Sequence, residues 1–331
     1  MPVVASGANA VLPKGIAIGH ASDKEAATGC TAILCKEGAV GSVAVRGGAP
    51  ATRETDLLAP QNLIESVHAV VLSGGSAFGL DAASGVMRFL EEKGVGLPFK
   101  GATVPLVVGA SLFDLDVVTA KVRPTADMGY AAAAAAQERV LETGALGAGT
   151  GASVGRFMGS SHAMKGGLGV ASVELDGLVV SAVVAVNSLG SVYDQEKARY
   201  IAGAYIKNEE SPAGFTLVDP LDTLAQLLKN QDDAGAERSN TTIGAVLTNA
   251  CITKTEALRV ASMAHDGMAR AIYPIHTSFD GDALFTLATG EVETSADLVG
   301  ALGALVVERA IIDAVLSAKE AYGLPCASLV Q

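Results

Sequence analysis

The stretch Ser239-Asn240-Thr241-Thr242-Ile243-Gly244-Ala245-Val246-Leu247-Thr248-Asn249 marks an abrupt change of character in the chain. Before it runs a polar segment, residues 230–240, which is rich in charge and in turn-forming residues. After it, apolar residues of strand character begin at once. We therefore expect Thr241 at a loop-to-strand boundary and a strand over 243–248 around which the rest of the fold is organised.

The position of Thr241 suggests a chemical role. If the Asn240–Thr241 bond were cut, the threonine would carry a free α-amine beside its own hydroxyl, so one residue would supply a nucleophile and a candidate base. The polar linker before it is the kind of segment in which a chain tolerates cleavage. The alternative is that Asn240 and Thr241 simply open a strand. Taken alone, the local pattern favours that alternative.

The composition restricts the classes of partner. Half of the 331 residues are apolar, so the chain can bury a large core in one layered domain or two. A net charge of −12 repels nucleic acid and anionic membranes and suits small neutral or cationic substrates. The four cysteines form no CxxC pair, so we expect buried thiols in a cytoplasmic protein without a metal site or other cofactor. Residues 1–15 lack the apolar core of a signal peptide.

Two glycine-rich segments lack the spacing of nucleotide-binding loops. Residues 73–79 follow an apolar strand and open a helix, so Gly74 and Gly75 are candidate binding residues in a corner suited to an oxyanion or carboxylate. A tight packing turn explains that corner equally well. No lysine follows its second glycine, which excludes a Walker loop. The segment 147–156 follows a predicted helix and lacks the G-x-G-x-x-G spacing, which excludes a dinucleotide site.

Residues 170–175 and 178–186 are predicted to form a hairpin around an Asp176-Gly177 turn. Asn187 ends its second strand. An asparagine there is commonly a turn former, but its NH₂ group is also the kind of donor that an oxyanion hole uses.

A third polar segment, His276-Thr277-Ser278-Phe279-Asp280-Gly281-Asp282, leads into an apolar strand. Two carboxylates flanking one glycine can orient an ammonium, hold a proton near a hydroxyl or bind a hard cation. Asp-Gly-Asp is also an ordinary turn signature, and taken alone we favour the turn. We interpret His276, a single histidine, as structural.

The remaining elements are predicted from periodicity and cap signals. Thr253 and Glu256 form a capping box that begins a helix through Ala271. The others are a hairpin of strands 31–35 and 41–46 turning at Lys36-Glu37-Gly38, strands at 68–72 and 104–113, and helices at 126–143, 221–229 and 295–321.

Together these segments resemble a family of self-cleaving N-terminal-nucleophile aminopeptidases and amidases. That family includes L-aminopeptidase D-Ala-esterase/amidase, β-peptidyl aminopeptidases and endo-type 6-aminohexanoate-oligomer hydrolase, and the last looks most similar. The resemblance covers nearly the whole chain. Its most specific part is the pair Asn240-Thr241-Thr242-Ile243 and Phe279-Asp280-Gly281-Asp282-Ala283-Leu284-Phe285, supported by segments 46–57, 72–80, 147–169 and 185–187.

The resemblance implies an α/β fold, a four-layer αββα sandwich. It forms one structural domain from an α chain (1–240) and a β chain (241–331), cut between Asn240 and Thr241, and assembles as homo-oligomers that are often tetramers. The implied roles are Thr241 as nucleophile, Asn187 as the amide that contacts substrate or oxyanion, and Asp280 and Asp282 as the acid pair that positions the nucleophile and its amine.

Two positions depart from the pattern of the oligomer hydrolase. Arg156 stands where that enzyme looks to have a lysine, and Phe113 where it has a tyrosine. Arginine stays charged and cannot act as a neutral base, and phenylalanine lacks the phenol that could donate to an oxyanion. We expect both to affect the choice of substrate and the rate more than the reaction class.

The sequence leaves three functions open. The first is hydrolysis of amide or peptide bonds in small substrates through an acyl-enzyme. The second is acyl transfer of the ornithine acetyltransferase type, since those enzymes share the fold and also cleave themselves before a threonine. The third is a non-catalytic binding protein of the same fold that is never processed.

Overall fold

The strand that begins at Thr241 lies in the interior of the main sheet. A computed structural model, which describes residues 3–139, 141–229 and 240–330, shows it as β17 (Thr241–Cys251). It pairs antiparallel with β12 (Leu178–Asn187) and parallel with β19 (Ala283–Glu293). All of its residues except the last are buried. The predicted strand is confirmed and begins two residues earlier, at Thr241. The polar linker at 230–239, predicted to tolerate cleavage, lies outside the described residues.

The main sheet has ten strands. Their order is β1 (Val4–Ser6), β11 (Gly167–Leu175), β12, β17, β19, β3 (Thr28–Val45), β5 (Ser66–Ser73), β8 (Val107–Ser111) and β4 (Thr52–Arg53), and β2 (Ile16–Asp23) pairs with β3 beside this path.

The long strand β3 connects the two halves of this sheet. Its last residues pair with β19, and its first residues pair with β2 and β5. The predicted hairpin with a turn at Lys36-Glu37-Gly38 is wrong, because the chain continues in one direction through that segment. The pairing with β5 breaks between Leu34 and Ala39, and Gly38 has a φ of +84°. The extra residues therefore form a bulge, which bends the strand instead of reversing it.

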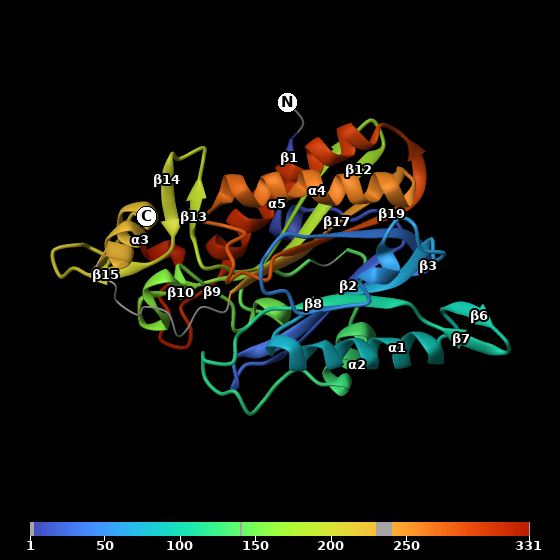
Figure 1. Cartoon of the computed structure of the whole chain (residues 1–331), viewed down its shortest axis with the longest axis horizontal. Coiled ribbons are helices and arrows are strands. Elements are labelled where there is room, and N and C mark those ends of the chain that lie inside the picture. Colours follow the sequence, from blue (N-terminus) through green and yellow to red (C-terminus); the bar gives the residue numbers. More distant parts are fainter. Residues whose placement is uncertain (1–2, 140, 230–239, 331) are drawn as a thin grey trace.

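Helices cover both sides of the sheet (Figure 1). On one side lie α4 (Lys254–Ala271) and α5 (Ala296–Ser317), and on the other lie α1 (Ala82–Glu92) and α2 (Ala126–Ala134). One apolar cluster lies beneath α4 and α5, a second between the two halves of the sheet, and a third beneath α1 and α2. Successive side chains of β17 alternate between the first two clusters, as the pleat requires. The shared second cluster joins both halves into one mixed α/β domain.

Smaller elements surround this core. In the described part of the chain, four small sheets combine β6 (Leu97–Phe99) with β7 (Ala102–Val104), β9 (Ser153–Val154) with β10 (Met164–Lys165), β13 (Ser191–Asp194) with β14 (Arg199–Ala202) and β18 (Ile272–Tyr273), and β15 (Tyr205–Lys207) with β16 (Phe215–Leu217). The predicted helix near 221–229 is present as α3 (Pro220–Lys229).

Local signals placed several boundaries correctly. The hairpin of β11 and β12 turns at Asp176 and Gly177, which both have positive φ, as the tightest hairpin turns require. Helix α4 begins with the predicted capping box, in which Thr253 and Glu256 bond reciprocally. Helix α5 occupies most of the predicted range 295–321.

Other predictions failed where distant parts of the chain intervene. The helix predicted over 126–143 ends at Ala134, because Gln137 exchanges two backbone hydrogen bonds of 2.9 Å with Ile18 of β2. The strand predicted over 104–113 is regular only over 107–111. Cys251 is exposed, so the prediction of buried thiols holds only for Cys30, Cys35 and Cys326.

Candidate functional site

Thr241 and Asn187 lie side by side although 53 residues separate them in the chain. They are register partners at the adjoining ends of β17 and β12. Both residues are buried. Within β17 and β12, the residues two and four positions away belong to the apolar cluster between the two halves of the sheet. Because side chains alternate along a strand, Thr241 and Asn187 lie on that same face. The candidate site therefore lies at one end of the space between the halves.

The peptide bond before Thr241 is polarised by its surroundings. The Thr241 hydroxyl lies 2.5 Å from the carbonyl oxygen of Asn240. The same oxygen accepts a hydrogen bond of 2.9 Å from the backbone amide of Gly281. A side chain at position 281 would place its Cβ 2.8 Å from the Thr241 Oγ1, so glycine leaves room for the Thr241 hydroxyl. Hydroxyl, carbonyl and amide donor thus converge on the bond that is predicted to be cut.

The carboxylate of Asp282 makes three polar contacts, one with Thr242 and two with His276. Its Oδ1 accepts a hydrogen bond of 2.7 Å from the backbone amide of Thr242, the residue after the candidate nucleophile. Its Oδ2 accepts from the backbone amide of His276 at 3.1 Å and lies 2.8 Å from the Nδ1 of the same residue. The side chain is completely buried. Asp282, the residue before β19, therefore fixes the start of β17 through the amide of Thr242.

Asp280 is less fully satisfied than Asp282. Its Oδ2 accepts from the backbone amide of Thr277 at 2.9 Å and from the Thr277 hydroxyl at 2.6 Å. Its Oδ1 is buried and has no hydrogen-bond partner among the described residues. Burial, followed by the nearby charge of Asp282, raises the pKa of Asp280 to about 6, against the opposing effects of Thr277 and of the backbone amide of Leu189. Such a carboxyl group can exchange a proton near neutral pH.

The segment that follows β3 lies against the acid pair. The backbone amide of Gly47 donates to the carbonyl oxygen of Asp282 at 3.2 Å, and that of Ala49 donates to Asp280 at 2.8 Å. A Cβ on Gly47 would lie 2.3 Å from backbone atoms of both aspartates. This close approach requires glycine, and it holds the Asp-Gly-Asp turn in place.

The side chain of Asn187 is oriented by two backbone groups. Its Oδ1 accepts a hydrogen bond of 2.9 Å from the amide of Ser153, and its Nδ2 donates to the carbonyl oxygen of Phe113 at 2.9 Å. One Nδ2 hydrogen remains for another acceptor. Phe113 thus contributes a backbone oxygen to the site. Sequence reasoning missed Ser153, whose only signal was its place in the glycine-rich segment 147–156.

Arg156 contacts the Asn187 environment through the side chain of Ser153. The buried guanidinium donates to the Ser153 hydroxyl at 3.0 Å and forms an ion pair with Asp116. A cavity of about 240 Å³ adjoins these residues and is also lined by Tyr205 and Tyr322. Arg156 and Ser153, the serine that orients Asn187, therefore both line this cavity.

The glycine corner binds a carboxylate of its own chain. The amide of Gly75 donates to Asp114 Oδ1 at 2.7 Å, and the Thr28 hydroxyl donates to Asp114 Oδ2 at 2.7 Å. A Cβ on Gly74 would lie 2.0 Å from Asp114 Oδ2. Burial raises the pKa of Asp114 to about 6. Substrate binding at Gly74 and Gly75 stays a prediction. In this structure the side chain of Asp114 contacts both glycines.

A buried lysine, which sequence reasoning also missed, lies beside this corner. The Nζ of Lys165 donates to the carbonyl oxygens of Gly149, Ala152 and Gly166 at 3.0, 2.7 and 3.1 Å. Burial lowers its pKa to about 7, against the opposing charge of Asp114. Lys165 thereby ties the loop that leads to Ser153 to the segment that begins β11.

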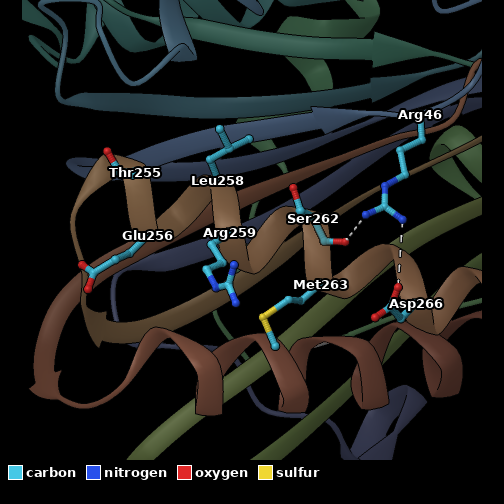
Figure 2. Close-up of a pocket in the computed structure, with 8 residues that line it drawn as sticks. All are labelled: Arg46, Thr255, Glu256, Leu258, Arg259, Ser262, Met263 and Asp266. Atoms are coloured by element: carbon cyan, nitrogen blue, oxygen red, sulfur yellow. Dashed lines mark hydrogen bonds and ion pairs between the residues drawn. The ribbon is translucent and has the colours of Figure 1, made fainter.

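A larger hollow lies elsewhere on the surface. It has a volume of about 460 Å³ and lies along the outer face of α4, where Arg46 reaches Ser262 and Asp266 (Figure 2). None of the predicted site residues lines it. Among the described residues, no group of three or more acidic, histidine or cysteine side chains is placed to hold a metal ion. No helix in the described part of the chain is long and apolar enough to cross a membrane.

The fold matches that of known aminopeptidases. L-aminopeptidase D-Ala-esterase/amidase of Ochrobactrum anthropi, described as a variant of the Ntn hydrolase fold, superimposes with a TM-score of 0.66 and 18% identity over 96% of this chain and 88% of that one. The model of peptidase family S58 matches residues 13–326, so the chain belongs to that family.

Curated relatives agree with this assignment. An uncharacterized aminopeptidase of Mycobacterium leprae is 41% identical over 94% of this chain and 91% of its own length. A 6-aminohexanoate-oligomer endohydrolase of an Agromyces strain is 30% identical over 92% of this chain and 81% of its own length. The family resemblance seen in the sequence is confirmed.

Proposed function

We propose that this chain is a self-cleaving N-terminal-threonine hydrolase of amide and peptide bonds in small substrates. The observation that carries the proposal is the convergence of the Thr241 hydroxyl and the Gly281 amide on the carbonyl of Asn240. A nucleophile and an oxyanion donor are what amide cleavage needs at one carbonyl group. Membership of a peptidase family supports the same reaction class.

The first stage is maturation. The Thr241 oxygen attacks the Asn240 carbonyl carbon, and the Gly281 amide stabilises the negative charge that develops on the carbonyl oxygen. The C–N bond breaks as the hydroxyl proton passes to the leaving amine, with Asp280 as the candidate carrier. Water then hydrolyses the resulting ester, which releases the carboxylate of Asn240 and the free hydroxyl and amine of Thr241. The products are an α chain (1–240) and a β chain (241–331) that stay associated.

The second stage is turnover. The Thr241 hydroxyl attacks the carbonyl carbon of a substrate amide, and its own α-amine or an aspartate of the pair takes the proton. The free Nδ2 hydrogen of Asn187 and nearby backbone amides stabilise the oxyanion. The proton passes to the departing amine, which leaves an acyl ester on Thr241. Water hydrolyses this ester and restores the hydroxyl.

The substrate class follows from the relatives and from charge. One relative is named an aminopeptidase and another a 6-aminohexanoate-oligomer endohydrolase, so we infer a small peptide or oligoamide that enters near the cavity beside Arg156. A net charge of −12 favours neutral or cationic substrates over acidic ones.

We further propose the architecture and assembly that the resemblance implies. The three apolar clusters support a four-layer αββα sandwich, with two helices on each outer side and the two halves of the sheet inside. We expect a homotetramer that works in the cytoplasm.

The deciding experiment compares intact masses of purified wild type, Thr241→Ser and Thr241→Ala. We expect wild type and Thr241→Ser to give two polypeptides that begin at residues 1 and 241, because both keep a hydroxyl. Thr241→Ala should give one full-length polypeptide without amidase activity towards amino-acid p-nitroanilides and short oligoamides. Wild type that is active while it remains full-length refutes the proposal. Transfer of the acyl group to an added amine in preference to water indicates the acyltransferase instead.

A further inference from the structure

A row of two histidines lies behind Asp282, on the side away from Thr242. His276 belongs to the loop before β19, and its Nδ1 lies 2.8 Å from Asp282 Oδ2. Its Nε2 lies 3.2 Å from the Nδ1 of His265, on α4. The Nε2 of His265 lies 2.9 Å from the carbonyl oxygen of Ala44, at the end of β3. This row connects the acid pair to a different helix and a different strand.

The far end of the row determines which atoms carry protons. A backbone carbonyl oxygen can only accept, so the Nε2 of His265 must donate to Ala44. His265 is fully buried, and burial lowers its pKa to about 3, so the ring is neutral and carries only that one proton. Its Nδ1 is then an acceptor. The hydrogen bond between the rings therefore requires a proton on the Nε2 of His276.

The near end of the row requires a second proton. Asp282 already accepts hydrogen bonds from the backbone amides of Thr242 and His276. Donors to a carboxylate favour its ionised form. An ionised carboxylate can only accept, so the Nδ1 of His276 must donate to it. In this arrangement both ring nitrogens of His276 act as donors, one to His265 and one to Asp282.

We propose that His276 is a positioning residue whose ring His265 holds as an imidazolium. This cation keeps Asp282 ionised. Asp280 is then the member of the acid pair that exchanges the proton. The pair needs such a division, because two buried carboxylates close together do not both ionise readily. The catalytic consequence rests on the proposed hydrolase function, whereas the charge of His276 does not.

Other groups around the ring are consistent with this assignment. Asp282 and Asp280 supply negative charge from the turn that follows the histidine. His265 faces the ring from α4 at a centroid distance of 4.7 Å. Arg46, after β3, adds positive charge that acts on His265 and favours its neutral form. The neutral His265 thus keeps its role as an acceptor next to a cation.

The charge can be measured without any activity assay. The protein contains five histidines, so ¹⁵N-histidine labelling with single-histidine variants assigns every ring. In the uncleaved Thr241→Ala protein at about pH 7.5, we expect both nitrogens of His276 to show the shifts of protonated nitrogen, and His265 to show one protonated Nε2. A neutral His276 ring under those conditions refutes the proposal, whether or not the wild type is a hydrolase.

The catalytic consequence is tested by His276→Asn. The φ of residue 276 is +58°, a region that asparagine tolerates better than most residues, and the Asn amide can still donate to Asp282. Only the positive charge and the link to His265 are lost. The acid limb of the pH–rate profile should then move by about one pH unit, because the charge of Asp282, which acts on Asp280, is no longer held by the His276 cation. An unmoved acid limb in an active variant contradicts the positioning role.

Matched variants separate this role from packing. His68→Asn serves as control, because His68 lies on β5 and accepts a hydrogen bond from the Leu106 amide, which an Asn oxygen can also accept. It should leave the pH profile unchanged. His265→Gln supplies one donor and one acceptor, as the neutral imidazole does, and should retain the wild-type profile. His265→Leu supplies neither and should shift the profile as His276→Asn does. Equal behaviour of the two His265 variants contradicts the proposal.

Discussion

Replacement of Asp280 by asparagine should stabilise the folded protein as pH rises, although it removes a group that the proposed reaction uses. The carboxyl group is completely buried, and its Oδ1 has no hydrogen-bond partner among the described residues. The folded protein therefore holds the Asp280 proton more tightly than the unfolded chain does. The two Thr277 donors to Oδ2 can be accepted equally well by the amide oxygen of asparagine.

The magnitude follows from the pKa of Asp280, which burial raises from 3.8 to about 6. A raised carboxyl pKa contributes stability that is fully present below the unfolded pKa and is lost as pH rises through the folded pKa. Between about pH 5 and about pH 7.5, this single group should cost the folded state about 1.4 kcal/mol. Asparagine does not titrate, so the cost disappears in the variant.

The comparison uses the uncleaved Thr241→Ala background, so that maturation does not differ between the two proteins. Urea unfolding at both pH values gives the free energy of unfolding with and without Asp280→Asn. Any pH-independent cost of the amide cancels in the difference. We expect the variant to gain about 1.4 kcal/mol relative to its parent as pH rises through this range.

The control in the same background is Asp266→Asn, which removes an exposed carboxylate on α4 whose solvent-exposed ion pair with Arg46, at 4.0 Å, contributes little to stability. Its stability difference should not change with pH. If Asp280→Asn behaves like this control, Asp280 is not a proton-holding group in the folded protein. The assignment of Asp280 as the proton carrier in maturation is then wrong.

Three further substitutions test the site and its frame. Asn187→Ala should lower turnover on the order of a hundredfold or more, because it removes the proposed oxyanion donor, and the protein should still fold but with a lower unfolding midpoint, because the Ser153 amide and the Phe113 carbonyl lose a buried partner; unchanged turnover would remove Asn187 from the mechanism. Ser153→Ala keeps the backbone donor to Asn187 and loses the hydroxyl, which accepts from Arg156 and makes a long hydrogen bond of 3.4 Å to Asn187 Oδ1, so we expect a drop of less than about tenfold in kcat, and a loss as large as that of Asn187→Ala contradicts this hydrogen-bond assignment. Gly74→Ala should lower the free energy of unfolding in urea by about 1–3 kcal/mol, because its Cβ would lie 2.0 Å from Asp114 Oδ2. The control Gly303→Ala on α5 meets only ordinary contacts at 3.6 Å or more and should be neutral or stabilising. Equal unfolding midpoints of the two variants contradict the steric argument.

Much of the site could be listed from the sequence, because its residues carry local signals. Asn187 ends a strand whose hairpin turn is legible in Asp176-Gly177, and Asp280 and Asp282 flank a glycine before an apolar run. Ser153, Asp114 and Lys165 could not be found in this way. Their importance comes from contacts with residues far away in the chain, such as the hydrogen bond between Ser153 and Asn187, 34 residues apart.

The sequence alone determined where Thr241 stands, at the start of a buried strand, because the change from polar to apolar residues and the pleat of a strand act over a few neighbouring residues. It also determined the capping box of α4 and the family. Only the tertiary structure decided that Asn187 lies beside Thr241 and that β3 continues through Gly38 without a turn. It also decided that α4 places His265 next to His276, which contacts the acid pair. Strand register and helix packing are set by burial across the whole core, and no short segment contains that information.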